Sequence, residues 1–503
     1  MYSRVYSGIV YGIEGKIITV EADVSGGLPC FTLVGLLASE VKEAGERVKN
    51  AIRNSGYQLQ AKRITVNLSP ADIRKSGTGF DVAIAVSMLC SYGIVKQESI
   101  SDVLFLGELG LGGEIKPVKG ILPILDEAMH SGIHTCIVPA DNLCEAKLVH
   151  NCNVVGVHSF CDVIAYLSGE EVLQPQKVSV PENTGNLSDF KDVKGQEALV
   201  RGVTIAAAGM HNVLLAGPPG SGKTMIAKRI PSILPDLTYD ERVLMTKIYS
   251  AAGLLDRKSQ LLMHRPFRSP HHTITKYALI GGGAIPKPGE ITLANSGVLF
   301  LDEFPEFSKS VIEVLRQPME EREIVLSKIH GNFRFPADFM LVAAMNLCPC
   351  GNYPNIKRCT CSVSERKRYI SKISQPILDR MDMQLLAAPV AYEDLYAGKA
   401  SVSSKEIKEQ VSCAHKIQQR RYEKLGILFN SQLDGDSFEK YCSLSASCKE
   451  IMKTANEKLN LSARANARMR KVARTIADLD HSDDIQERHV LEALSYRGME
   501  GIS

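Results

Sequence analysis

The residues with the most specific chemistry form one run of eight, Gly217-Pro218-Pro219-Gly220-Ser221-Gly222-Lys223-Thr224, with the spacing GxxxxGKT. Glycines let the backbone approach a ligand closely, so successive N–H groups can point at phosphate oxygens. Lys223 can reach the β- and γ-phosphates of a nucleotide, and the Thr224 hydroxyl can bind Mg²⁺. An apolar run precedes the loop at 213–216 and a helix-compatible run follows at 225–229, as a phosphate-binding loop requires. The sequence therefore predicts ATP and Mg²⁺ as ligands.

Polar residues end two further apolar strands. Residues 298–301 lead into Asp302 and Glu303, about 80 residues after the loop, and residues 339–345 lead into Asn346. Asp302 can bind in the Mg²⁺ shell, and Glu303 can act as the general base that polarises the attacking water. Asn346 can bond that water or the γ-phosphate. The alternatives are a solvated acidic strand end and an asparagine at the edge of a core.

Length and composition limit the class of protein. A chain of 503 residues should hold about three domains, and its 45% hydrophobic and 23% charged residues are typical of a soluble globular protein. The net charge of only +3 confines any nucleic-acid surface to a local patch. No apolar run approaches the roughly 20 residues that span a bilayer, so no membrane partner is expected. Thirteen cysteines without a signal peptide favour reduced thiols and a cytoplasmic location.

Residues 1–172 have the pattern of an α/β domain. We predict strands at 17–22, 64–68, 103–108 and 136–139, with helices at 41–55, 80–90 and 121–130. The runs 70–81 and 106–120 resemble the Lon protease domain (S5 domain 2-like). The Ser–Lys dyad of Lon-type proteases would fall at Thr78 or Gly79 and at Leu122, so the resemblance implies the fold without the protease. Residues 173–188 are polar and predict a linker.

The next two regions resemble the two parts of an AAA+ module. Residues 189–196 resemble its entry, and Gln375–Asp382 resembles the PxLLxRxD stretch of the MCM and magnesium-chelatase branch. That likeness implies that Arg380 is an arginine finger, which acts in the nucleotide site of a neighbouring subunit. The alternative is that Arg380 only forms a salt bridge at the end of a helix. Residues 393–503 resemble a helical lid, and Arg464 matches its sensor-2 arginine, contacting nucleotide in its own or a neighbouring subunit. The predicted lid helices are 404–425, 437–441, 445–459, 462–480 and 485–495.

Six more stretches make the likeness specific. They are Phe267–Thr273, Gly281–Gly283, Pro288–Ile291, Leu301–Phe307, Leu315–Glu320 and Ala473–Leu479. With them, the whole chain resembles the ComM/YifB family of magnesium-chelatase-like AAA+ ATPases. The resemblance implies an α/β fold: a Lon-protease-like domain, a P-loop AAA+ domain at 189–392 of the helix-2-insert branch, and an all-α lid.

The same resemblance implies a function. We expect a hexameric motor, assembled with ATP, that binds branched or single-stranded DNA without sequence specificity. It would drive branch migration during homologous recombination, as in natural transformation. A magnesium-chelatase-type ATPase that drives metal insertion and a protein-remodelling AAA+ machine remain as alternatives.

In this branch residues 265–295 would form an insert in the second helix and residues 321–335 a hairpin before the strand bearing Asn346, both lining a central pore. The alternating runs 324–327 and 332–335 support the hairpin independently. Arg322, Lys328 and Arg334 could bind DNA phosphates, although a solvated ribbon with ordinary charges is the alternative. Residues 357–380 carry seven basic against two acidic side chains and could face either DNA or another subunit.

Four cysteines form two CxC pairs separated by eight residues: Cys348, Cys350, Cys359 and Cys361. Four thiolates suffice for tetrahedral Zn²⁺, and the family shows this cluster. Four protein ligands leave no open position, so a structural rather than a catalytic zinc is expected. Free or redox-active thiols are the alternative.

Overall fold

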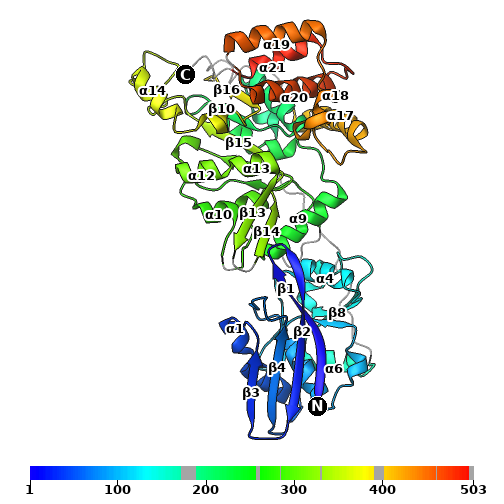
Figure 1. Ribbon diagram of the computed structural model, residues 1–503. Helices are drawn as coiled ribbons and strands as arrows, with labels where there is room; N and C mark the ends of the chain where they lie inside the picture. The colour runs from blue at the N-terminus through cyan, green and yellow to red at the C-terminus, as the bar shows by residue number, and fades with distance from the viewer. Residues whose placement is uncertain are drawn as a thin grey trace.

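The structure is a computed structural model, and it describes residues 1–170, 188–255, 261–283, 285–328, 331–389, 402–459 and 461–497. All but the last residue of the predicted linker 173–188 therefore lies outside the described residues. Figure 1 shows a β-rich N-terminal domain at one end, a central α/β domain, and a helical domain at the other end. No helix in the described ranges is long and apolar enough to cross a membrane. All thirteen cysteines are free thiols.

The N-terminal domain is built on a seven-stranded sheet of order β3-β4-β2-β1-β5-β8-β9. The long strand β2 pairs antiparallel with both β1 and β4. The remaining pairs of the sheet, β3 with β4, β1 with β5, β5 with β8 and β8 with β9, are parallel. The strands are β1 (Tyr2–Tyr11), β2 (Glu14–Ser25), β3 (Cys30–Val34), β4 (Arg63–Ser69), β5 (Val103–Phe105), β8 (Thr135–Pro139) and β9 (Asn153–Val157). The short pair β6 (Glu108–Leu109) and β7 (Ile115–Lys116) stands apart from this sheet. The helices are α1 (Ser39–Lys42), α2 (Ala44–Asn54), α3 (Asp81–Ser91), α4 (Ile121–His130), α5 (Leu143–Ala146) and α6 (Phe160–Leu167).

Strand β1 was not predicted, and its buried serines explain why. Ser3 and Ser7 alternate with exposed or half-buried residues and are fully buried, so the strand lacks the apolar alternation that marks an amphipathic strand. Each hydroxyl is satisfied by a backbone carbonyl, Ser3 by that of Ser87 at 2.7 Å and Ser7 by that of Phe105 at 2.9 Å. These bonds tie β1 to α3 and β5 at little cost.

The positions that align with a Lon-type dyad hold no dyad here. The Thr78 hydroxyl is hydrogen-bonded to the Glu108 carboxylate, and Gly79 has no side chain. Leu122 lies on α4 and is 2% exposed. The position that aligns with the lysine of the dyad therefore holds a buried apolar side chain.

The central domain is built on a parallel five-stranded sheet of order β11-β12-β15-β10-β16. Strands β10, β12 and β15 are buried along their whole length, as expected when helices cover both faces of a parallel sheet. The strands are β10 (Val213–Ala216), β11 (Phe267–Arg268), β12 (Val298–Leu301), β15 (Met340–Met345) and β16 (Met383–Leu386). The helices are α7 (Glu197–Gly209), α8 (Lys223–Ala227), α9 (Tyr239–Ala252), α10 (Lys276–Ile280), α11 (Glu290–Leu293), α12 (Lys309–Val314), α13 (Arg316–Glu321), α14 (Val363–Ile370) and α15 (Gln375–Leu378).

A separate antiparallel ribbon joins β13 (Glu323–Lys328) to β14 (Gly331–Pro336), so the two predicted strands of the hairpin are confirmed. The C-terminal region is all helical, and its five predicted helices are confirmed to within a few residues at their ends. They are α17 (Ser404–Tyr422), α18 (Gly435–Tyr441), α19 (Ala446–Leu459), α20 (Ala463–Leu479) and α21 (Glu487–Ser495).

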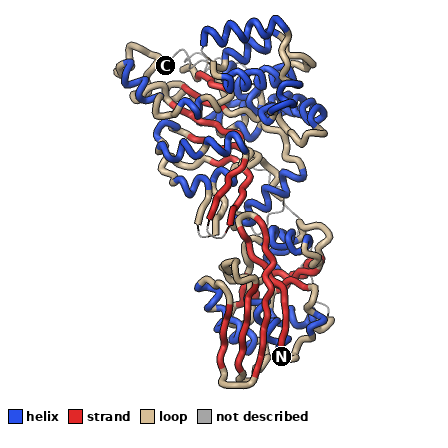
Figure 2. The backbone as a smooth tube through the Cα atoms, viewed as in Figure 1, coloured by secondary structure: helices blue, strands red, loops and turns tan. Residues whose placement is uncertain are grey.

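The N-terminal domain packs directly on the central domain at the end of its longest strands. At the turn between β1 and β2, the Tyr11 ring lies 4.5 Å from the ring of Phe333 on β14, and Ile13 belongs to the same buried core as Phe333. Beside it α4 lies against α9, where Lys247 pairs with Asp126 at 2.7 Å. Figure 2 shows the β1–β2 turn ending against the β13–β14 ribbon.

Candidate functional site

Three buried strands bring the predicted nucleotide-binding residues to one edge of the central sheet. Strand β15 lies between β10 and β12, and all three run in the same direction. The loop 217–224 follows β10, the pair Asp302 and Glu303 follows β12, and Asn346 follows β15. Because the carboxyl ends of parallel strands meet at one edge, residues up to 129 apart in the chain become neighbours.

Lys223 occupies the centre of this edge. Its ammonium donates to the carbonyl oxygens of Gly217 and Pro218, at 2.7 and 2.8 Å, and to Asn346 Oδ1 at 3.3 Å. All three acceptors are neutral, and burial lowers the pKa of Lys223. An anion at this position would stabilise the charged amine, so the residues fit a phosphate group.

The loop itself leaves room for that anion. Gly220 and Gly222 have φ of +77° and +82°, and a Cβ added at either glycine would meet no atom within 4 Å. Helix α8 begins at Lys223, so its first N–H groups point towards the loop. The buried Gln196 side chain holds the loop by donating a hydrogen bond to the Ser221 carbonyl oxygen at 3.3 Å.

The oxygen ligands proposed for Mg²⁺ also lie together. The Thr224 hydroxyl donates to Asp302 Oδ2 at 2.7 Å, while Asp302 Oδ1 accepts the Glu303 N–H at 2.9 Å. A hydroxyl next to a carboxylate is a set of hard oxygen ligands that suits Mg²⁺. Glu303 itself has φ of +51°, which is uncommon for a non-glycine residue, and its side chain is 62% exposed.

The two candidate arginines, Arg380 and Arg464, lie together but do not reach this edge. Both pair with Glu320 Oε1, Arg380 Nη2 at 2.5 Å and Arg464 Nη2 at 3.5 Å. Within the described part of the chain neither forms a hydrogen bond or ion pair with the loop 217–224. Burial disfavours the charged form of Glu320, but the hydrogen bond and charge of Arg380 outweigh it and lower its pKa. Arg380 is only 3% exposed, so in this structure it forms a salt bridge, which was the alternative to an arginine finger.

Asp382 holds the lid helix in the position that makes this pairing possible. Its carboxylate is 2% exposed and pairs with Arg468, one helical turn beyond Arg464 on α20. It also accepts the Asn212 N–H at 2.8 Å. Burial alone would raise the pKa of Asp382, but the charges of Arg468 and His211 hold it well below its usual range.

Comparison with known proteins matches all three parts of the chain to magnesium-chelatase models. Residues 189–395 match the model described as magnesium chelatase, subunit ChlI. Residues 20–142 match subunit ChlI of Mg-chelatase, and residues 401–497 match the ChlI C-terminal model. Lon protease 2 of Bacillus subtilis is 28% identical over 194 residues, which cover 34% of this chain and 35% of that protein. The partial match agrees with the Lon-like fold inferred for the N-terminal domain.

Two relatives match over the whole length. Competence protein ComM of Haemophilus influenzae is 40% identical over 505 residues, covering 98% of this chain and 97% of that protein. YifB of Salmonella typhimurium is 40% identical over 502 residues, covering 99% and 97%. The chain belongs to the ComM/YifB family. Its resemblance to magnesium-chelatase-like AAA+ proteins is therefore confirmed along the full chain.

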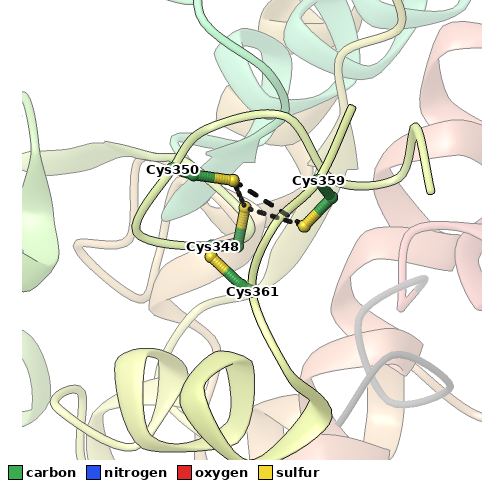
Figure 3. Close-up of side chains that lie close together, drawn as sticks. All are labelled: Cys348, Cys350, Cys359 and Cys361. Carbon is green, nitrogen blue, oxygen red and sulfur yellow. Dashed lines mark hydrogen bonds between the residues drawn. The ribbon is translucent and has the colours of Figure 1, made fainter. Parts of the chain in front are cut away.

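In this ComM/YifB family member the four cysteines of the CxC pairs converge directly beyond Asn346 (Figure 3). Their sulfur atoms all lie within 4.8 Å of one another, and the Sγ atoms of Cys348 and Cys359 are 3.8 Å apart. Sulfur atoms around a tetrahedral Zn²⁺, each about 2.3 Å from the metal, lie roughly 3.8 Å apart. Backbone N–H groups of Asn352 and Thr360 lower the pKa of Cys350 to about 5, whereas burial raises the pKa of Cys348 to about 12, so without a metal the cluster favours one thiolate at Cys350. The set therefore fits zinc.

The cysteine loop also touches the nucleotide loop. Gly351 has φ of +78°, and a Cβ added to it would lie 3.0 Å from Pro219 Cδ. A metal that fixed the cysteine loop would thereby help to fix both Pro219 and Asn346.

The three candidate DNA contacts are not equivalent in the ComM/YifB chain. Arg322 lies at the base of the hairpin, pairs with Asp338 at 3.3 Å and donates to the Ser431 carbonyl oxygen at 3.0 Å. Arg334 is 73% exposed and pairs with Glu323 at 3.2 Å on the neighbouring strand. Lys328 is exposed near the end of β13. Arg322 is thus bound to the lid, whereas Lys328 and Arg334 are exposed. The register of the ribbon puts these two side chains on opposite faces, because Arg334 pairs with Val325 and Lys328 lies three residues further along that strand. The hairpin tip, residues 329–330, lies outside the described residues.

Part of the basic stretch 357–380 lies beside Glu303. Arg368 and Lys372 line a cavity of about 510 Å³ together with Glu303 and Asn346. Lys372 pairs with Glu306 at 3.0 Å on the same wall. This placement favours a subunit interface over DNA for these two cations, because they adjoin the expected γ-phosphate side of the site.

Sequence reasoning gave no role to Glu320 or to His272. Both lie inside quoted motifs, Leu315–Glu320 and Phe267–Thr273, but their partners come from distant parts of the chain. Glu320 meets arginines from two other segments, and His272 Nδ1 lies 3.3 Å from Glu303 Oε2. Motif membership was the signal available, and it does not say what a residue contacts.

Proposed function

We propose that this chain hydrolyses ATP as a ring-forming AAA+ motor and uses the energy to move branch points in DNA. The observation that carries the proposal is the convergence of Lys223, Thr224, Asp302, Glu303 and Asn346 at one sheet edge. The full-length similarity to a competence protein supports DNA as the substrate. Homologous recombination, as in natural transformation, is the process in which a motor of this kind would act.

The chain's own residues divide the chemistry among them. Bound Mg²⁺ supplies charge neutralisation at the β- and γ-phosphates. Lys223 and the N–H groups of the loop bind the phosphates, while Thr224 and Asp302 hold the metal. Glu303 orients the attacking water and accepts its proton, and Asn346 fixes the position of that water.

The arginines explain why an assembly is required. Arg380 and Arg464 converge on Glu320 away from the loop of their own chain, so we assign both to the nucleotide of a neighbouring subunit. There Arg380 would offset charge developing on the transferred phosphoryl group. A closed ring, which we take to be a homo-hexamer, gives every site such a neighbour.

DNA contacts are assigned to exposed cations of the hairpin, one on each strand. Lys328 and Arg334 offer cations without sequence information, so binding should be independent of sequence and should weaken steeply with salt. Residues 265–295 are proposed as the helix-2 insert that moves with this hairpin. Arg322 stays a proposed contact, but it is left out of the test variant because its bonds to Asp338 and Ser431 also join the hairpin to the lid.

The test compares the wild type with the double variant Lys328→Ala/Arg334→Ala on three- and four-stranded junctions with labelled strands. The matched control is Lys440→Ala/Arg488→Ala, since Arg488 is also exposed, at 63%, and also pairs with a surface carboxylate. The hairpin variant should keep ATP hydrolysis without DNA but lose DNA stimulation and strand movement. The salt slope of DNA binding should fall by up to about two per engaged subunit. The control pair should behave as the wild type.

One observation favours a second candidate. Models of a magnesium chelatase subunit match all three parts of the chain, which suits an ATPase that drives metal insertion. If a clean ring hydrolyses ATP but moves no branch on any junction, the DNA motor is refuted and this candidate replaces it. Stimulation of hydrolysis by an unfolded protein would instead indicate protein remodelling.

A further inference from the structure

Strand β3 forms one edge of the N-terminal sheet. Within the described part of the chain, β4 lies on one side of β3 and no strand lies on the other. Figure 1 shows β3 as the outermost strand of this domain. An edge strand presents a row of backbone N–H and C=O groups without strand partners, so it can pair with a strand from another chain.

The sequence of this edge lacks the side chains that usually prevent such pairing. Residues 26–38, which include β3, contain no charged side chain. Charges and prolines within an edge strand commonly block it, but Pro29 lies just before β3 rather than within it. Thr32 and Val34 are exposed on the face of β3 opposite to Phe31. The free edge of β3 is therefore open to a partner.

A cavity of about 590 Å³ borders this edge. It is lined by the first residues of β3, by α2 and by the segment that leads into β4. Half-buried rings form the apolar part of its wall: Phe31, Tyr57 and Tyr92. Side chains alternate between the two faces of a strand, so a strand added to β3 would direct side chains on the Phe31 face towards this cavity.

The charges of the cavity favour an acidic occupant. Lys49, Arg53 and Lys62 line it against one carboxylate, Glu46, among the described residues. Glu46 pairs with Lys49 at 3.1 Å, and Arg53 donates to a neutral amide oxygen at 2.8 Å. Within the described ranges Arg53 and Lys62 thus have no carboxylate partner, and acidic side chains of an occupant would supply one.

An extended peptide fits this site better than single-stranded nucleic acid, which also binds to cations and aromatic rings. The Lys49 ammonium lies 4.8 Å from the ring centroid of Phe31, and that of Lys62 lies 5.6 Å from that of Tyr92. The chain's own cations therefore cover the ring faces on which bases would stack. Strand β3 carries no cation for a phosphate, whereas its backbone groups can pair with those of a peptide.

We propose that β3 and this cavity bind an extended acidic segment of a partner protein, which joins the sheet as a further strand. Backbone hydrogen bonds to β3 supply affinity, and acidic side chains over the cavity supply specificity. We call this surface the β3 edge site. It lies on the N-terminal domain and not at the nucleotide edge of the central sheet, so the proposal goes beyond the proposed function and requires neither ATP nor DNA.

The experiment uses the full chain without ATP or DNA, and a fluorescein-labelled octapeptide of alternating valine and glutamate. Fluorescence anisotropy measures affinity, and hydrogen exchange locates the bound peptide. The glutamate peptide should bind and slow the exchange of the β3 amides. A peptide with lysine in place of glutamate should bind at least about tenfold more weakly. A glutamate peptide that is N-methylated throughout cannot donate to β3, so it should be weakened at least as much.

The double variant Arg53→Glu/Lys62→Glu reverses the two cations that have no carboxylate partner. It should bind the glutamate peptide about tenfold more weakly and the lysine peptide more tightly than the wild type does. The matched control is Lys96→Glu/Lys116→Glu, which reverses two exposed cations elsewhere on the same domain. The control should change neither affinity.

Several results would overturn the β3 edge site. One is unchanged exchange of the β3 amides at the highest soluble concentration of the glutamate peptide. Equal affinity of the N-methylated peptide would exclude strand addition, and equal affinity of the lysine peptide would exclude an acidic partner. Binding of an eight-nucleotide oligothymidylate that is lost in Arg53→Glu/Lys62→Glu, without binding of the glutamate peptide, would assign the site to nucleic acid. Protection of β3 that rises with protein concentration in the absence of peptide would assign the edge to a second copy of this chain.

Discussion

Asp382→Asn should loosen the lid by breaking the buried pair with Arg468. Removing one partner of a buried ion pair costs about 3–5 kcal/mol, because the other charge remains buried. Asparagine still offers an oxygen to the Asn212 N–H, and Arg468 is 17% exposed and can reach water, so the lower end applies. We therefore expect a loss of about 3 kcal/mol in the local stability of α20.

Hydrogen exchange measures this loss without requiring the whole chain to unfold in one step. A loss of about 3 kcal/mol corresponds to roughly 100-fold faster exchange of the α20 amides. ATP hydrolysis should fall as well, since α20 carries Arg464. Asp379→Asn is the control: Asp379 lies in the same motif but only accepts a surface hydrogen bond from Gln375, so exchange should change little.

The pH dependence of the stability of α20 gives a second check on the contribution of Asp382. The folded-state pKa of Asp382 is lowered, so its contribution is fully present above the unfolded value of about 3.9 and is lost as pH falls below it. The difference between wild type and Asp382→Asn should therefore shrink below about pH 4. Unchanged protection of α20 in the variant at neutral pH would refute the reasoning.

Three further predictions concern chemistry, metal and assembly. Lys223→Ala should abolish nucleotide binding, whereas Glu303→Gln should bind ATP and hydrolyse it roughly 100-fold more slowly; normal turnover by Glu303→Gln in a steady-state assay would remove it as the base. Protein purified without added zinc should contain about one zinc per chain by elemental analysis, lost in Cys348→Ser/Cys350→Ser together with thermal stability. A zinc-free but fully active wild type would contradict a structural site. Arg380→Ala should bind ATP but lose most hydrolysis, and mixing it with Lys223→Ala should recover some activity in a titration of the two chains; no recovery at any ratio speaks against action in trans.

The features that the sequence predicted well are each encoded in a short run of neighbouring residues. The phosphate-binding loop, the acid pair after β12 and Asn346 after β15 each depend on a short run whose apolar strand and polar end are visible together. The lid helices were found because their pattern is helical, and their ends differ from the prediction by at most three residues, as where α17 ends at Tyr422 although Glu423 could continue a helix. The CxC spacing likewise brought four sulfur atoms together.

What it did not predict depends on contacts between distant segments. The partners of Arg322, Asp338 and Ser431, could not be predicted because they come from the segment after β14 and from the lid. Neither the meeting of Arg380 with Arg464 at Glu320 nor that of His272 with Glu303 has a periodic signal. Strand β1 was missed because buried serines removed its apolar alternation.

The contact between the β1–β2 turn and β14 has a practical consequence for dividing the chain. Phe333 is 4% exposed because Tyr11 and Gly12 cover it, although more than 300 residues separate them in sequence. A fragment that begins at residue 189 would uncover this ring and leave Lys247 on α9 without its partner Asp126. Exposed apolar patches of this kind promote self-association. The polar stretch before residue 189 therefore divides the sequence into two parts, but each part buries some of its side chains against the other.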